Sequence, residues 1–133
     1  MLRNAGGRRV AVLKIDVEGH EAQSLRGARR SLEAKLVDSV VWERHPYWRS
    51  ALKLAPLIHE VNEVAGYGYH VYLQEGNTTI RIDGPYWRAD LDLSSKFNKV
   101  DVISVLANST LDGLMRSRLL APCHESQVVA PIS

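Results

Sequence analysis

The stretch LKIDVEGHEAQSL, residues 13–25, joins an apolar run to an amphipathic one and concentrates titratable side chains between them. The run Val10–Ile15 is nearly continuously apolar and rich in β-branched residues, which predicts a strand buried on both faces of a parallel sheet. From His20 onward apolar residues recur at steps of three and four, which predicts an amphipathic helix weakened or divided at Gly27. The titratable cluster therefore lies where a strand passes into a helix.

The rest of the chain continues the alternation of strands and helices. The further expected elements are a strand at 39–43, a helix from about Pro56 to Gly66, a hairpin of strands 69–73 and 78–82, a loop over 82–97, a strand at 100–107 and a helix over 111–120. Early strand–helix–strand alternation implies parallel pairing, and the hairpin adds an antiparallel element. We predict one α/β domain with a leader at 1–9, a core at 10–120 and a loose tail at 121–133.

Length and composition bound the class of protein. The chain has 133 residues, of which 45% are hydrophobic and 24% charged, so one folded domain is expected rather than disorder. No apolar run approaches the roughly 18 residues that span a bilayer, and no secretory signal is recognised. The single cysteine, Cys123, cannot form an internal disulfide, which favours a cytoplasmic location. A net charge of +2 is too small to indicate nucleic-acid binding.

Two carboxylates follow the ends of the first two predicted strands. In an open α/β sheet ligands bind outside the carboxyl ends of the strands, where Asp16 and Glu43 are expected. If those strands are neighbours, both carboxylates project into one crevice and could hold a cation, act as a general base or accept hydrogen bonds from substrate hydroxyls. His45, His20 and Glu21 are expected near the same rim. The alternative is structural: Asp16 or Glu18 accepts N–H bonds at the helix start, where a negative charge is favoured by about 0.3–1 kcal/mol.

Aromatic side chains offer a second, weaker indication of a binding site. Trp42 lies inside an apolar strand and is expected in the core. Tyr47, Trp48, Tyr86 and Trp87 fall in predicted loops, where they could either line a pocket for a ring-bearing substrate or only cover the core.

The motifs of the first third of the chain resemble those of a known enzyme family. KIDVEGHE at 14–21, LRGA at 25–28 and VVWE at 40–43 resemble the FkbM family of methyltransferases, specifically over residues 12–44 and in strand pattern over the whole of residues 12–107. The resemblance implies a Rossmann-like fold that uses S-adenosylmethionine, mostly to methylate hydroxyl groups of sugars and natural products. The strands at 10–15 and 39–43 would then be the fourth and fifth of such a sheet.

The resemblance also implies catalytic positions. Asp16 matches the acidic residue at the active-site rim, and it is expected to orient or deprotonate the hydroxyl that attacks the methyl group. Glu43 matches another acid of the family. His20 and His45 are expected to assist, and the reaction requires chiefly positioning because a sulfonium is already a reactive donor.

Binding positions follow in the same way. Asp16 and Glu18 are expected to contact the cofactor, and Glu21, Tyr47 and Trp48 the small-molecule substrate. No metal, nucleic acid or membrane partner is expected.

One expected part of such a fold has no counterpart in this sequence. These folds cradle the cofactor with a glycine-rich loop after their first strand, and nothing before Val10 supplies that strand or loop. We therefore expect the chain to represent the C-terminal half of the fold and to bind S-adenosylmethionine weakly by itself. One edge of the strand at 10–15 would be bare, which favours self-association or pairing with a partner chain.

Two other functions remain open at this point. The first is a non-catalytic α/β module that pairs with another chain through the bare edge. The second, ranked last, is a metal-dependent hydrolase built on Asp16, Glu18, His20 and Glu43, for which no complete metal-ligand spacing is present.

Overall fold

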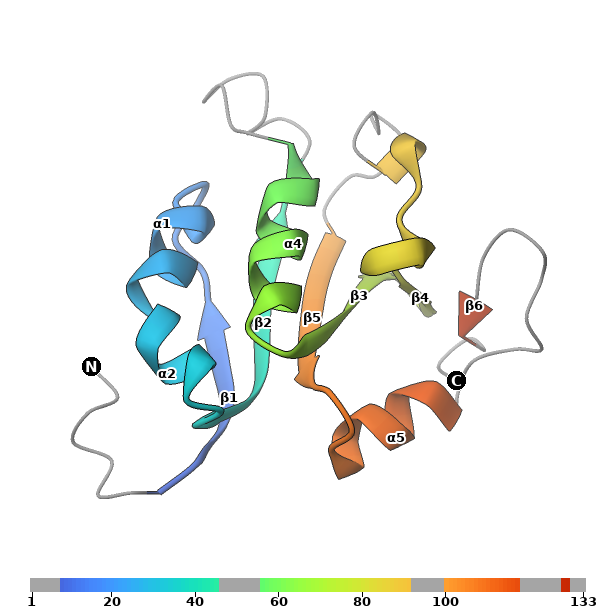
Figure 1. Cartoon of the computed structure of the whole chain (residues 1–133). Helices are drawn as coiled ribbons and strands as arrows, with labels where there is room; N and C mark the ends of the chain where they lie inside the picture. Colours follow the sequence, from blue (N-terminus) through green and yellow to red (C-terminus); the bar gives the residue numbers. More distant parts are fainter. Residues whose placement is uncertain (1–7, 46–55, 92–99, 118–127, 130–133) are drawn as a thin grey trace.

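The structure, a computed structural model, describes residues 8–45, 56–91, 100–117 and 128–129. These residues form a six-stranded sheet in the order β1-β2-β5-β3-β4-β6, flanked by helices (Figure 1). The strands are β1 (Val10–Ile15), β2 (Val37–Arg44), β3 (Tyr69–Glu75), β4 (Thr78–Arg81), β5 (Val100–Leu106) and β6 (Val128–Val129). The helices are α1 (Glu21–Gly27), α2 (Arg29–Glu33), α4 (Leu57–Gly66) and α5 (Thr110–Ser117), with short 3₁₀ turns at Gly84–Tyr86 and Ala89–Leu91. The predicted α/β fold is confirmed, and it is consistent with part of a Rossmann-like sheet.

The first two strands are parallel neighbours, as the strand–helix–strand alternation predicts. The prediction that the first strand is buried on both faces was wrong: of the β1 residues only Ile15 is buried, because β1 lies at one edge of the described sheet. The register of the two strands runs from Val10 opposite Val37 to Ile15 opposite Trp42. The crossover between them contains α1 and α2, which separate at Ala28, next to the glycine where a division of the helix was predicted. The carboxyl ends of β1 and β2 therefore lie side by side.

Strand β5 lies in the middle of the sheet, between β2 and β3, and is antiparallel to both. The expected strand at 100–107 is confirmed, and its place in the sheet is a structural finding. Among the described strands β1 forms one edge of the sheet, and its Val12 is 57% exposed. A valine so exposed on an edge strand is a ready surface for pairing with another strand.

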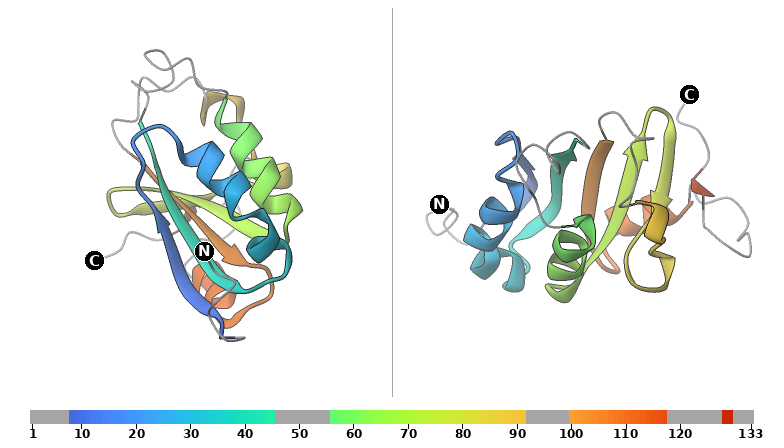
Figure 2. Two further views of the ribbon diagram at one scale, coloured as in Figure 1. Left: turned by 90° about the vertical axis from the view of Figure 1, so that its left-hand side faces the viewer. Right: turned by 90° about the horizontal axis from the view of Figure 1, so that it is seen from above.

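The core lies between the sheet and the helices α1, α2 and α4, which cover the same face (Figure 2). Leu25 of α1, Leu32 of α2 and Val61 of α4 are completely buried there, and each contributes roughly 1.5–3 kcal/mol through burial. Trp42 of β2 is buried among them, which confirms its predicted place in the core.

The second half of the chain follows the predicted pattern with small differences in bounds. β3 and β4 form the expected hairpin, with Leu73 opposite Ile80. Within the expected loop, the described residues form the two 3₁₀ turns, and residues 92–99 lie outside the described part. In the expected tail, Val128–Val129 pairs with β4 as strand β6.

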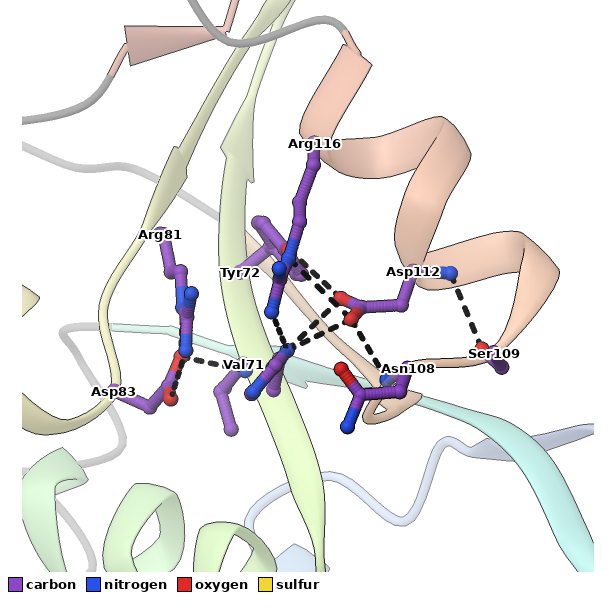
Figure 3. Close-up of polar contacts among 9 residues, drawn as sticks. Val71, Tyr72, Arg81, Asp83, Asn108, Ser109, Asp112 and Arg116 are labelled. Carbon is purple, nitrogen blue, oxygen red and sulfur yellow. Dashed lines mark hydrogen bonds and ion pairs between the residues drawn. The ribbon is translucent and has the colours of Figure 1, made fainter. Parts of the chain in front are cut away.

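Helix α5 is fixed to the sheet through one buried carboxylate. Asp112 is completely buried and accepts hydrogen bonds from the backbone N–H of Asn108 at 3.0 Å, from the Tyr72 hydroxyl at 3.0 Å and from Nδ1 of His70 at 2.9 Å (Figure 3). The Ser109 hydroxyl accepts the N–H of Asp112 at 3.2 Å and so caps the start of the helix. His70 and Tyr72 alternate with the core residues of β3, so α5 packs on the opposite face of the sheet from α4.

These contacts lower the pKa of Asp112. Burial by itself would raise the pKa, but the hydrogen bonds from the Asn108 N–H, His70 and Tyr72 outweigh burial and bring the pKa below its ordinary value of 3.8. A carboxyl group whose pKa is lower in the folded chain stabilises the fold above its unfolded pKa. That stabilisation is lost as the pH falls through the folded pKa.

We therefore expect Asp112→Asn to lower the free energy of unfolding at pH 7 by about 1.5–3 kcal/mol, the usual contribution of hydrogen bonds to a charged group. As the pH falls below about 4, the ordinary pKa of an aspartate, the wild-type chain should progressively lose this contribution, so the two stabilities should converge. Urea unfolding at several pH values measures both effects. Glu75→Gln, an exposed carboxylate at the hairpin, is the control. Parallel pH curves for the wild type and Asp112→Asn would contradict the prediction.

Candidate functional site

The titratable cluster forms a tight turn between β1 and α1. Asp16 directly follows the last residue of β1 and is exposed. Glu18 has a φ of 47° and Gly19 a φ of 102°, and the N–H of His20 bonds to the Val17 carbonyl at 3.3 Å. A left-handed conformation is uncommon for a residue with a side chain, so Glu18 is held there by its surroundings. The turn thus places Asp16 at the carboxyl end of β1.

Glu21 is the buried member of this cluster, with 3% of its surface exposed. Its Oε2 accepts the N–H of Gly19 at 2.9 Å and its Oε1 accepts the N–H of Val17 at 3.3 Å. The structural alternative assigned such bonds to Asp16 or Glu18, but in the described part of the chain neither of these residues makes one. His20 is the N-cap of α1 and makes no side-chain capping bond. The role that the alternative foresaw therefore falls to Glu21, whose contact with a substrate stays a prediction.

A cleft of about 440 Å³ lies beside Asp16. Residues 13–17, from β1 and the turn, line one part of it. Ser24 of α1 and Ala28, which directly follows α1, line the other. Its walls are mostly apolar, with the carboxylate of Asp16 and the charged group of Lys14 among them. A mostly apolar cleft of this size with a few polar groups is typical of small-molecule sites.

Asp16 and Glu43 occupy corresponding positions at the carboxyl ends of two neighbouring strands. The last registered pair of β1 and β2 is Ile15 opposite Trp42, and the two carboxylates come immediately after it. Glu43, however, is not among the residues that line the cleft. Its neighbours along β2, Trp42 and Arg44, are buried on the helical side of the sheet, so alternation directs Glu43 to the other face. A single crevice shared by both carboxylates stays a prediction.

A third acid, Asp101 of β5, lies directly opposite Glu43. Like charges at directly opposite positions of a sheet repel each other. Both side chains are half-buried. Asp101 was not predicted as a site residue, because it stands in an apolar strand whose pairing with β2 has no local signal.

The carboxyl end of β2 is tied to α4 by a buried ion pair. Nη1 of Arg44 lies 2.8 Å from Oε2 of Glu60, with 10% and 6% of the two side chains exposed. His45 follows Arg44 and is half-buried, and both His45 and Glu43 make further interactions. Arg44 and Glu60 were not predicted as site residues, but they fix the end of the strand that carries Glu43 and His45.

Only two of the four loop aromatic residues predicted from the sequence lie in the described part of the chain. Tyr47 and Trp48 lie outside the described residues. Tyr86 and Trp87 are half-buried; the Arg81 guanidinium lies 4.5 Å from the centre of the Tyr86 ring, and Trp87 packs against the core. Within residues 8–45, 56–91 and 100–117, no three His, Cys, Asp or Glu side chains gather closely enough to hold a metal ion. The hydrolase alternative requires such a group.

Comparison with known protein families supports the resemblance seen in the motifs. The model of the methyltransferase FkbM domain matches residues 1–71, which include β1, the turn, α1, α2 and β2. The chain belongs to the FkbM methyltransferase family. No curated protein and no solved structure gave a match. Methyltransferases of this kind generally use S-adenosylmethionine and a small-molecule substrate. Among the described helices of this family member, none is long and apolar enough to cross a membrane.

Proposed function

We propose that this chain takes part in the transfer of a methyl group from S-adenosylmethionine to a hydroxyl group of a sugar or natural product. The observation that carries the proposal is the position of Asp16. Its exposed carboxylate stands at the carboxyl end of β1, beside a cleft suited to a small molecule, on a turn that Glu21 holds. Residues of the FkbM motif build this whole arrangement.

The residues of the cleft fit such a cofactor. S-adenosylmethionine, when bound, supplies an electrophilic methyl group on a positively charged sulfur. The carboxylate of Asp16 lines the cleft and favours a positive charge there, while Lys14, which also lines it, opposes one. The exposed carboxylate of Glu18, two residues along the turn, adds a second negative charge close by. Asp16 would accept the hydroxyl proton as the oxygen forms its bond to the methyl carbon and the carbon–sulfur bond breaks.

The other predicted residues have supporting roles in this proposal. Glu43, His20 and His45 would assist Asp16 at the carboxyl ends of β1 and β2. Tyr47 and Trp48 would contact the substrate, and residues 10–120 would act as one α/β core. We propose weak cofactor binding, because among the described strands β1 has a neighbour on one side only.

A second function rests on the same edge of the sheet. The exposed Val12 and the side of β1 that has no neighbour among the described strands favour a non-catalytic module that pairs with a second copy of the chain or another strand. This function needs no cofactor.

One experiment distinguishes the two functions. S-adenosylmethionine is titrated into the labelled chain while NMR follows the amides of residues 13–28, and the same sample is sedimented. The first function predicts shifts confined to the cleft, with a dissociation constant of about 1 mM, or roughly −4 kcal/mol. The neutral product S-adenosylhomocysteine should bind more weakly, because it lacks the positive charge. The absence of saturable shifts, together with concentration-dependent association, would favour the second function and contradict the first.

A further inference from the structure

The two walls of the cleft are joined by one side chain. Residues 13–17 form one wall, and Ser24 and Ala28 lie on the other. Glu21 is the first residue of α1, which carries Ser24, and its carboxylate accepts the N–H groups of Val17 at 3.3 Å and Gly19 at 2.9 Å. The same carboxylate therefore connects the helix to the turn that follows β1.

The turn needs this support. Glu18 and Gly19 both have positive φ values, 47° and 102°, and a side-chain-bearing residue such as Glu18 adopts that conformation at a cost in free energy. The N–H groups of Val17 and Gly19 would lose their partners without Glu21, and Gly19 is itself buried. An unsupported turn would relax toward ordinary backbone conformations, and Asp16, one residue before Val17, would move with it.

Burial argues against a direct contact between Glu21 and a ligand. Only 3% of Glu21 is exposed, and both carboxylate oxygens already accept backbone hydrogen bonds. A substrate would have to displace those bonds to reach it. Asp16, by contrast, is exposed and lines the cleft.

We infer that Glu21 is a positioning residue, which holds the turn after β1 so that the carboxylate of Asp16 stays at the cleft. The inference rests on the proposed function for the role of Asp16. It assigns Glu21 an effect on ligand binding that passes through Asp16 and through no contact of its own.

The first test concerns the turn alone. Glu21→Gln keeps the size of the side chain, but its amide group faces one of the two N–H donors with a donor of its own. We expect amide hydrogen exchange at Val17 and Gly19 to accelerate at least 10-fold, while the amides of β2 keep their rates. Glu33→Gln, which alters an exposed ion pair with Arg29 on α2, is the matched control and should change neither set.

The second test is a double-mutant cycle on S-adenosylmethionine binding, followed by NMR. In the wild-type background Glu21→Gln should weaken binding at least 10-fold. In an Asp16→Asn background it should weaken binding less than 2-fold, because the residue that it positions has already lost its charge. An equal loss in both backgrounds would overturn the inference, since it would indicate a direct contact or a general loss of structure.

Two further outcomes are decisive. If Glu21→Gln does not fold, Glu21→Asp takes its place, because it keeps the charge while its shorter side chain does not reach both N–H groups. If the wild-type chain binds no S-adenosylmethionine, the proposed function fails. The positioning role of Glu21 is then decided by amide hydrogen exchange in the turn alone. Unchanged exchange at Gly19 in the variant would overturn its positioning role as well.

Discussion

Replacing Glu60 by alanine is expected to lower the free energy of unfolding by about 1.5–3 kcal/mol, because it removes a buried hydrogen bond between two charged groups, the Glu60 carboxylate and the Arg44 guanidinium. The two groups lie 2.8 Å apart, with 10% and 6% of their side chains exposed. They join β2 to α4, so the loss weakens the attachment of the helix to the sheet. Domains of this size are stable by about 5–15 kcal/mol, so the variant should lose a measurable fraction of its stability.

Urea unfolding followed by circular dichroism measures this effect. The matched control is Glu33→Ala, which breaks an Arg–Glu pair with 64% and 45% of its side chains exposed. Such an exposed pair contributes about 0.5 kcal/mol or less. The double variant Arg44→Met/Glu60→Leu should recover most of the loss, because two apolar side chains replace two buried charges. Equal effects of Glu60→Ala and Glu33→Ala would contradict the prediction.

The Arg44–Glu60 pair illustrates which features the sequence predicts and which it does not. Strands β1 to β5, the parallel pairing of β1 with β2 and the β3–β4 hairpin follow from local periodicity and turn residues, and all were predicted. The short strand β6 was not, because its residues lie in the expected tail. The ion pair joins residues 16 positions apart, and Asp112 meets His70 across 42 positions. Contacts of this kind depend on the placement of α4 and α5 against the sheet, which no local pattern determines.

The candidate site shows the same division. The motif at 14–21 was sufficient to predict that Asp16 comes directly after a strand, which the structure confirms. The role of Glu21 was missed because known capping patterns place the reciprocal acid three residues into the helix, whereas Glu21 is the first helical residue. Asp101 was missed because the central place of β5 became known only from the structure.

The last prediction concerns the proposed chemistry itself. Asp16→Asn should reduce the rate of methyl transfer to a hydroxyl acceptor by a factor of about 10²–10⁴, the usual contribution of a general base. Asparagine keeps the shape of the side chain, but it does not accept the proton that leaves the hydroxyl as the carbon–oxygen bond forms. Because Asp16 is exposed, the stability of the chain should change by less than about 0.5 kcal/mol.

The measurement is the yield of methylated product over time, detected by mass spectrometry with S-adenosylmethionine and a panel of sugar acceptors. Glu75→Gln, an exposed carboxylate at the β3–β4 turn, serves as the control and should retain the wild-type rate. Asp16→Glu keeps a base near the same place and should recover part of the activity. A variant Asp16→Asn as fast as the wild type would remove Asp16 from the reaction. Because cofactor binding is expected to be weak, the assay uses S-adenosylmethionine at several millimolar, above the expected dissociation constant of about 1 mM. A wild-type chain that methylates no acceptor under these conditions would contradict the proposed function.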